Sequence, residues 1–412
     1  MTAATPTPEF RSPDFLRAHI DHTLDFYQGR CVDPSGGFFQ HFKDDGRVYD
    51  ARTRHLVSST RFVFNHAMGA RHQGRAGYID HVRHGLRFIQ QAHGLPSGGH
   101  AWVIDWDGAS RQATVRDATL HAYGQAFVLL AHAHALMAGV VEAGAGVVQT
   151  VNFMAERFWQ PEHGLFADEI DASGMLSPYR GQNANMHSCE AFLAAHEATG
   201  DDRCLAMALG IAKEVTQTLA GRADGLVWEH YRSDWTPDWD YNRHDRSNIF
   251  RPWGYQTGHL TEWTKLLLQL ADRLGPDELP DWLMPTARHF FDTAMARGWD
   301  AEHGGMVYGF APDGQVCDGD KYFWVQAESL AAAAGLALRT GRDAYWQWYD
   351  KIWAYAWAHF VDHQHGAWYR ILTPDNRAYS DDKSPAGKTD YHTMGACWDV
   401  LRFMGALKAT QI

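Results

Sequence analysis

Six similar segments recur at nearly regular intervals along the chain, and this repetition constrains the fold more than any other feature of the sequence. They read GGFFQHFKDDG from Gly36, GGHAWVIDWDG from Gly98, GLFADEIDASG from Gly164, GLVWEHYRSDW from Gly225, GGMVYGFAPDG from Gly304 and GAWYRILTPDN from Gly366. Each opens with glycine, continues with apolar and aromatic residues in rough alternation, and in most copies closes on an Asp-Gly-like turn, which predicts a short hairpin. The intervals are 62, 66, 61, 79 and 62 residues. About 60 residues leave room for two helices of roughly 15 to 20 residues with their loops.

The sequence between hairpins predicts two kinds of helix. Six ranges are rich in Ala, Leu and Met and apolar on nearly every side, which is typical of helices buried on most faces: 52–70, 116–138, 185–199, 258–274, 323–339 and 390–407. Their partners carry charge on one face and apolar side chains on the other, as in 76–92, 201–220, 281–297 and 343–360. We therefore expect six inner helices that alternate with six outer ones.

This alternation predicts an all-α fold, a closed (α/α)6 barrel with short β-hairpins at one end. A length of 412 residues would ordinarily suggest two or three domains. The repeat instead predicts a single domain over residues 1–412. An open helical solenoid is the alternative, but six copies after a short leading segment are what closure needs.

Composition narrows the class of partner. The chain has 37 basic and 49 acidic residues, a net charge of −12, which argues against nucleic acid or an anionic membrane. No secretory signal or run of about 18 apolar residues is found, so we expect a soluble, cytoplasmic protein. The five scattered cysteines are expected to be reduced. An excess of His (25) and Trp (17) favours a polar small-molecule site such as a sugar pocket.

One position of the repeat concentrates polar residues. The residues just before the inner apolar runs are Arg61, Gln125, Glu190, Glu262, Glu328 and Gly395, and those three positions earlier are Ser58, Ala122, His187, His259, Val325 and His392. Residues three apart share a helix face. Burying such charges unpaired would cost several kcal/mol each, so we expect them to meet across a pocket at one mouth of the barrel. First-turn residues that satisfy local backbone groups are the alternative for any single pair.

Other chemistries find less support. The HVRH segment from His81 and the HFVDHQH segment from His359 lack a carboxylate at ligand spacing, so no metal site is predicted there. The chain has no Walker loop, no GxGxxG before a helix and no GxSxG elbow. Nucleotide chemistry and serine hydrolysis are therefore not indicated.

The predicted pocket suits acid–base work on a sugar. A histidine removes a proton next to a carbonyl at neutral pH, and an arginine stabilises the enediolate oxygen that results. Glycoside hydrolysis remains the rival, since Glu190, Glu262 and Glu328 could supply a carboxylate pair. Three histidines in the pocket favour proton transfer, because an inverting hydrolase would not need them.

Four segments carry a resemblance to a known family. RGQNANMHSCEAF from Arg180, YQTGHLTEWTKLLL from Tyr255, KTDYHTMGACW from Lys388 and LVSSTRFVFNHA from Leu56 resemble the hallmark motifs of the N-acylglucosamine 2-epimerase superfamily, and most of all its mannose isomerase and sulfosugar isomerase branch. The resemblance covers nearly the full length. The (α/α)6 fold of that family agrees with the repeat count.

The resemblance implies roles for individual residues. His259 and His392 would be the general acid/base pair, and Glu262 would orient His259. Arg61 would bind and polarise the sugar oxygens at carbons 1 and 2. The remaining expected substrate-binding residues are His187, Asn183, Asn185, Glu190, Gln125, Glu328 and the stacking residue Trp324, with Trp253 and Trp368 as further possible walls.

The implied reaction is the metal-independent isomerisation of D-mannose and D-fructose through a cis-enediolate. A 2-epimerase acting on mannose/glucose or on N-acylglucosamine is the alternative, and an (α/α)6 glycoside hydrolase is a more distant one. No metal or nucleotide cofactor is expected, and the protein is expected to be a monomer or homodimer. The long fourth interval carries extra residues, 237–253, which we expect to form a loop over the pocket mouth.

Overall fold

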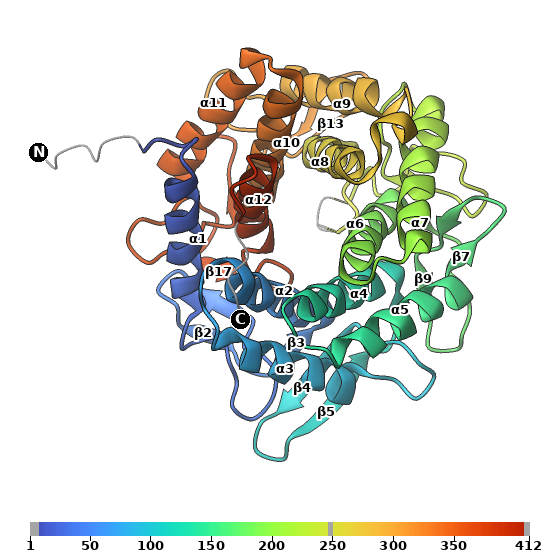
Figure 1. Cartoon of the computed structure of the whole chain (residues 1–412), viewed down its shortest axis with the longest axis vertical. Helices are drawn as coiled ribbons and strands as arrows, with labels where there is room; N and C mark the ends of the chain where they lie inside the picture. The colour runs from blue at the N-terminus through green and yellow to red at the C-terminus, as the bar shows by residue number, and fades with distance from the viewer. Residues whose placement is uncertain (1–7, 246–249, 408–412) are drawn as a thin grey trace, which may run out of the picture.

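Helices alternate between an inner and an outer ring around one axis in the computed structural model, which describes residues 8–245 and 250–407 (Figure 1). The inner helices are α2 (Leu56–His72), α4 (Ala122–Met137), α6 (Gln182–Thr199), α8 (Thr257–Arg273), α10 (Phe323–Thr340) and α12 (Tyr391–Phe403). The outer helices are α1 (Pro13–Tyr27), α3 (Tyr78–Phe88), α5 (Ala143–Arg157), α7 (Asp202–Lys213), α9 (Leu283–Gly298) and α11 (Asp343–His359). The predicted (α/α)6 barrel is confirmed.

Burial separates the two rings as the sequence pattern predicted. The first 15 residues of α8 are all buried, whereas the outer helix α11 buries only six of its 17. An inner helix packs against its ring neighbours and against an outer helix, so it needs apolar residues all round. Polar residues that nevertheless lie on an inner helix are therefore buried, which makes their partners informative.

The hairpins join neighbouring repeats at one end of the barrel. A short strand before each inner helix pairs with a strand of the following hairpin: β3 (Thr53–His55) with β4 (Val103–Asp107), β6 (Leu120–His121) with β9 (Glu169–Ile170), β10 (Arg180–Gly181) with β11 (His230–Tyr231), β12 (Tyr255–Gln256) with β13 (Gly309–Phe310), and β15 (Lys321–Tyr322) with β16 (Ile371–Leu372). Further antiparallel pairs are β1 (His41–Lys43) with β2 (Val48–Asp50), β4 with β5 (Gln112–Asp117), β13 with β14 (Val316–Asp318), and β7 (Trp159–Gln160) with β8 (Leu165–Phe166).

The last repeat closes onto the first. Strand β17 (Asp382–Ser384), before α12, pairs with β1 of the first hairpin, and α12 packs against α1 and α2. The ring of strand pairs is thereby complete, so the open solenoid is wrong.

The predicted helix ends were wrong where these strands form. Residues 52–55 and 116–121 were assigned to helices, but they contribute to β3, β5 and β6 because each pairs with a neighbouring hairpin strand. The last inner helix ends at Phe403 rather than at residue 407, and the outer helix α3 continues into a π-helical turn, Ile89–His93.

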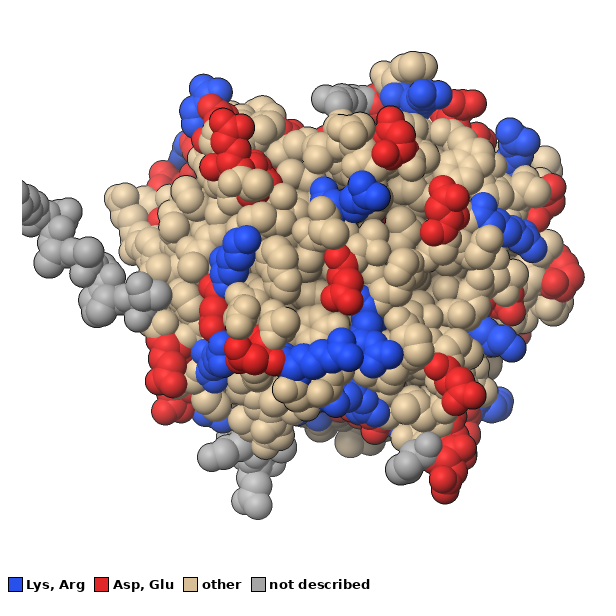
Figure 2. Space-filling view, turned by 90° about the horizontal axis from the view of Figure 1, so that it is seen from above, with Lys and Arg blue, Asp and Glu red and all other residues tan. Residues whose placement is uncertain are grey.

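The distribution of surface charge and the state of the cysteines agree with what the composition predicted. Lysines, arginines and acidic residues are interspersed over the face seen in Figure 2, with no large field of one sign. All five cysteines are free and four of them are buried. Within the described ranges, no helix combines the length and the apolar character that crossing a bilayer requires.

Candidate active site

A pocket lies at the hairpin end of the barrel, where the inner helices begin. Seven predicted site residues line it: Arg61, Asn183, His187, His259, Glu262, Trp324 and His392. They come from five inner helices, so the helix starts converge on the barrel axis as the repeat predicted.

Residues at the same position, counted from the start of each inner helix, lie next to one another around the pocket. The sixth residue is Arg61 in α2, Phe127 in α4, His187 in α6, Glu262 in α8 and Glu328 in α10. Neighbours in this series touch: Arg61 stacks on the Phe127 ring at 4.4 Å, and the Phe127 and His187 rings lie 4.8 Å apart. His187 Nε2 is 3.9 Å from Glu262 Oε1. Equivalent positions of α2, α4, α6 and α8 thus form a continuous row of contacts, and we call the set of these five sixth residues the sixth-residue ring.

His392, on α12, is held as a neutral imidazole by its two neighbours. Its Nε2 lies 3.2 Å from an amino nitrogen of Arg61, which can only donate, so Nε2 must accept. The ring proton therefore sits on Nδ1, which donates to Glu328 Oε1 at 2.7 Å. Burial, and next the charge of Arg61, hold the pKa of His392 well below its usual range.

His259, on α8, has a carboxylate partner that the sequence did not predict. Its Nδ1 lies 2.9 Å from Oε1 of Glu229, and the other Glu229 oxygen accepts from the Gln182 amide at 3.0 Å. Trp263 donates its indole N–H to the Gln182 oxygen at 2.8 Å, which fixes the orientation of that amide. The expected contact between Glu262 and His259 is wrong, because Glu262 points toward His187 instead. His259 thus directs Nδ1 at Glu229 and leaves Nε2 for the pocket.

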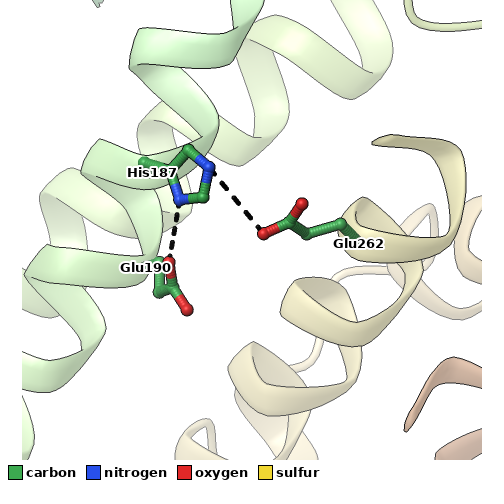
Figure 3. A group of neighbouring side chains, drawn as sticks. All are labelled: His187, Glu190 and Glu262. Carbon is green, nitrogen blue, oxygen red and sulfur yellow. Dashed lines mark hydrogen bonds and ion pairs between the residues drawn. The ribbon is translucent and has the colours of Figure 1, made fainter. Parts of the chain in front are cut away.

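His187 and its two glutamates occupy the wall between α6 and α8 (Figure 3). His187 Nδ1 is 2.9 Å from Glu190 Oε2, and the other Glu190 oxygen accepts from the Tyr391 hydroxyl at 2.6 Å. Burial lowers the pKa of His187, which favours a neutral ring. Glu190 is therefore placed behind His187 rather than in the pocket lining, and the expected direct contact of Glu190 with substrate does not fit.

Arg61 is clamped in a fixed orientation. Its guanidinium lies between the rings of Phe127 and Tyr391, at 4.4 and 4.7 Å from their centres. It also donates to the Gly387 carbonyl and lies 3.2 Å from the Tyr123 hydroxyl. These contacts hold a permanent positive charge beside the lone pair of His392.

Glu262 and Glu328, two acidic residues of the cluster, have shifted pKa values. Burial, and next the proximity of Glu328, hold the pKa of Glu262 well above its usual range. Burial also raises the pKa of Glu328, but Lys265 Nζ lies 2.6 Å from its Oε2 and opposes that rise. The shift at Glu262 thus favours its protonated form, whereas the ammonium group of Lys265 favours the ionised form of Glu328. The sets His187, Glu190, Glu262 and Glu262, Glu328, His392 are each compact enough to surround a cation.

Gln125 and Asn185 do not reach the pocket. Each is the fourth residue of its inner helix and faces the preceding hairpin. The Asn185 amide accepts from and donates to the Phe166 backbone at 2.8 and 2.9 Å, while Gln125 contacts the His100 ring and backbone at 3.0 and 3.4 Å. Gln326 of α10 binds the Met306 backbone in the same way. The substrate-binding role expected for Gln125 and Asn185 is therefore wrong: these residues fasten helices to hairpins.

Trp324 lies close to both catalytic candidates. Its ring lies 5.1 Å from that of His259 and 5.8 Å from that of His392. By contrast, Trp368 is 1% exposed and donates to His19, so it packs in the core.

The extra segment of the fourth repeat reaches the pocket mouth. Of the range 237–253, residues 246–249 lie outside the described part of the chain. Phe250 and Pro252 line the pocket. Phe250 stacks on His55 at 6.1 Å, and Arg251 pairs with Glu169 of a neighbouring hairpin. The described end of the segment thus reaches from the fourth repeat to the third hairpin and to strand β3.

Two residues of the site were missed, and both left a signal in the sequence. Glu229 is the fifth residue of its hairpin segment, a position held elsewhere by Gln40, Trp102, Asp168, Tyr308 and Arg370. Tyr308 and Arg370 also line the pocket. Comparing that hairpin position, as well as the helix starts, would have found Glu229. Lys265 is the lone cation within the buried part of α8.

Comparisons with known proteins agree with this fold. The family model of N-acylglucosamine 2-epimerase matches residues 37–396. A D-mannose isomerase of Marinomonas mediterranea is 50% identical over 397 residues, which cover 96% of this chain and 98% of that protein. A cellobiose 2-epimerase of Eubacterium cellulosolvens is 23% identical over 92% of this chain and 95% of its own length.

A solved structure extends the likeness to three dimensions. The crystal structure of a D-mannose isomerase superposes with a TM-score of 0.92 at 49% identity, covering 96% of this chain and 99% of that one.

Proposed function

The chain belongs to the N-acylglucosamine 2-epimerase family, in the branch of the D-mannose isomerases, and from this membership we propose that it interconverts D-mannose and D-fructose. One observation carries the proposal. Two buried imidazoles, His259 and His392, each turn Nδ1 toward a carboxylate and Nε2 toward one pocket that also holds Arg61.

In the proposed reaction His392 removes the proton from carbon 2 of the open-chain aldose. Its Nε2 lone pair lies beside Arg61, where an arginine would hold the sugar oxygens and stabilise the charge of the enediolate. The proton then goes to carbon 1, which completes the change from aldose to ketose. His259 lines the same pocket, also close to Trp324, and assists as the second acid/base group.

The oxygens must also exchange a proton, since the hydroxyl proton on O2 is lost and O1 gains one. Glu262 is suited to this step because it is 1% exposed and lines the pocket, and because its raised pKa favours the protonated form. We assign it the shuttle between O2 and O1 in place of the orienting role expected from the sequence.

The mouth favours a monosaccharide. Phe250 reaches over the pocket and stacks on His55, which leaves less room for a second sugar unit. Phe250→Ala should raise kcat/KM for a disaccharide such as cellobiose relative to that for mannose. An unchanged ratio would show that Phe250 does not limit substrate size.

Epimerisation at carbon 2 is the second candidate, because an imidazole on each face could return the proton to the opposite side of carbon 2. The two reactions share the enediolate and differ only in where the proton is delivered.

Incubation with D-mannose in heavy water, followed by NMR of the products, tests the proposal. We expect fructose that carries deuterium at carbon 1. Glucose as the main product would support the epimerase instead, and mannose recovered without exchange at carbon 2 would contradict both. Reducing sugar released from an oligosaccharide would point to the hydrolase.

A further inference from the structure

Lys265 is a buried ammonium group that the proposed reaction does not use. It lies on α8, three residues after Glu262, and is 2% exposed. A buried ammonium without partners costs several kcal/mol of effective desolvation. Here Nζ lies 2.6 Å from Glu328 Oε2 and 3.6 Å from Asp399 Oδ2, so the charge is compensated by carboxylates on α10 and α12.

This contact lies on the far side of His392 from the sugar pocket. Lys265, Asp399 and Glu328 line a second cavity deeper in the barrel, and none of them lines the sugar pocket. His392 lines both cavities and separates them. Lys265 therefore acts on any bound sugar only through the groups between them.

Lys265 lies within a cluster of acidic residues whose negative charge would otherwise favour the binding of a cation. Glu190, Glu262, Glu328 and Asp399 lie near one another here, and the cations that act on them include Arg61, Lys265 and Arg402. At 2.6 Å the ammonium occupies the position from which a cation would bind Glu328. The charge that keeps one of these carboxylates ionised is thus supplied by the chain itself.

The hydrogen bonds around His392 run in a single direction. Arg61 donates to Nε2, Nδ1 donates to Glu328 Oε1, and the Lys265 ammonium forms an ion pair with Glu328 Oε2. An ammonium at this distance favours the ionised form of the Glu328 carboxyl. If Glu328 were protonated, it could donate to Nδ1 and move the ring proton to Nε2. That tautomer has no lone pair in the pocket and faces Arg61 donor to donor.

We propose that Lys265 is a positioning residue that fixes His392 in its Nδ1–H tautomer by keeping Glu328 ionised. The proposal deepens the proposed function and rests on it, since the tautomer matters only if His392 removes a proton. Lys265 touches no substrate, and its effect passes through Glu328 alone.

The test is nitrogen-15 NMR of the histidine rings together with kinetics. In the wild type we expect His392 as the Nδ1–H tautomer. Lys265→Met should shift it to Nε2–H and lower kcat about 100-fold with little change in KM, since a histidine in the wrong tautomer costs up to about 10,000-fold. Lys265→Arg should restore the tautomer and part of the rate. Asp399→Asn is the matched control, because it removes the other partner of Lys265 and should leave the tautomer as in the wild type.

A double variant keeps the test decisive if Lys265→Met does not fold. In Glu328→Gln the amide oxygen still accepts from Nδ1 and no charge needs neutralising. Adding Lys265→Met to Glu328→Gln should therefore change kcat little, and the double variant should be faster than Lys265→Met alone. A large further loss in the double variant, or an Nδ1–H tautomer retained in folded Lys265→Met, would overturn the proposal. The tautomer is read without substrate, so failure to isomerise mannose would refute the function and leave this test intact.

Discussion

His259 and His392 share one pocket and one kind of partner, yet their carboxylates come from different layers of the barrel. Glu229 holds His259 from a hairpin and is fixed in turn by Gln182. Glu328 holds His392 from a neighbouring inner helix and is paired with Lys265. One histidine is thus oriented by a carboxylate of the hairpin layer that an amide holds in place, and the other by a carboxylate of the helix layer that pairs with an ammonium group.

This difference indicates that the layer of inner helices and the layer of hairpins contribute differently to the site. The helix layer supplies charge: Arg61 on one side of His392 and the Glu328–Lys265 pair on the other. The hairpin layer supplies shape, since Tyr308, Arg370 and the mouth residue Phe250 line the pocket from hairpins and loops. We expect changes in the helix layer to alter the chemical step and changes in the mouth to alter the choice of substrate.

Removal of either imidazole should have the largest effect. His392→Asn and His259→Asn should each lower kcat/KM about 1,000-fold, within the range of about 100 to 10,000 typical of a lost proton carrier. Steady-state kinetics with mannose measures this, and circular dichroism checks the fold. His363→Asn, at an exposed position, is the control. An active His392→Asn enzyme would break the account.

Substitution of Glu262 should have the second largest effect on activity. Its raised pKa means that the required protonated form is present at low pH and is lost as pH rises through that pKa. The activity of the wild type should therefore fall on the alkaline side. Glu262→Gln should lower kcat about 100-fold and remove this alkaline limb, because the amide cannot ionise. A limb that persists in the variant would assign it to another group.

Removal of the charge on either carboxylate partner, Glu328 or Glu229, should lower kcat by a similar factor. The two partners should differ in whether a nearby cation affects the histidine that they hold. Glu328→Gln and Glu229→Gln should each cost about tenfold in kcat, near the lower bound for groups that orient a functional histidine. Removal of Lys265, the cation that pairs with Glu328, should then change the tautomer of His392 and leave that of His259 unchanged. Equal sensitivity of both histidines to Lys265→Met, read from their nitrogen-15 shifts, would erase the distinction between the layers.

Metal removal should have the smallest effect. Dialysis against EDTA should leave kcat and KM for mannose unchanged, since Lys265 and the proton on Glu262 already compensate the carboxylates. Loss of activity that returns with Mn²⁺ or Zn²⁺ would place a cation between Glu262 and its neighbours.

The repeat made the fold predictable because each copy carries the same hairpin and the same inner apolar run. Closure could also be predicted from six copies, and the β17–β1 pair provides it. The first residues of the inner helices were harder to predict from the sequence, because residues such as 52–55 pair with a hairpin that is distant in sequence. The single domain over residues 1–412 stays a prediction that one cooperative unfolding transition would support.

The site was predictable where a residue's position on its helix decides its direction. His259, His392 and Arg61 line the pocket as expected. Gln125 was misplaced because it is the fourth residue of α4, two residues before the sixth-residue ring, and there it faces a hairpin. Glu229 was missed because no helix periodicity points to a loop residue that reaches a helix.

The central claim is that the imidazole of His392 carries the proton of carbon 2. Deuterium incorporation from heavy water, followed by NMR at carbon 2 of mannose and carbon 1 of fructose, tests it in wild type and His392→Asn side by side. We predict incorporation at both carbons by the wild type and at neither by the variant. Exchange at carbon 2 that continues in folded His392→Asn would contradict the account.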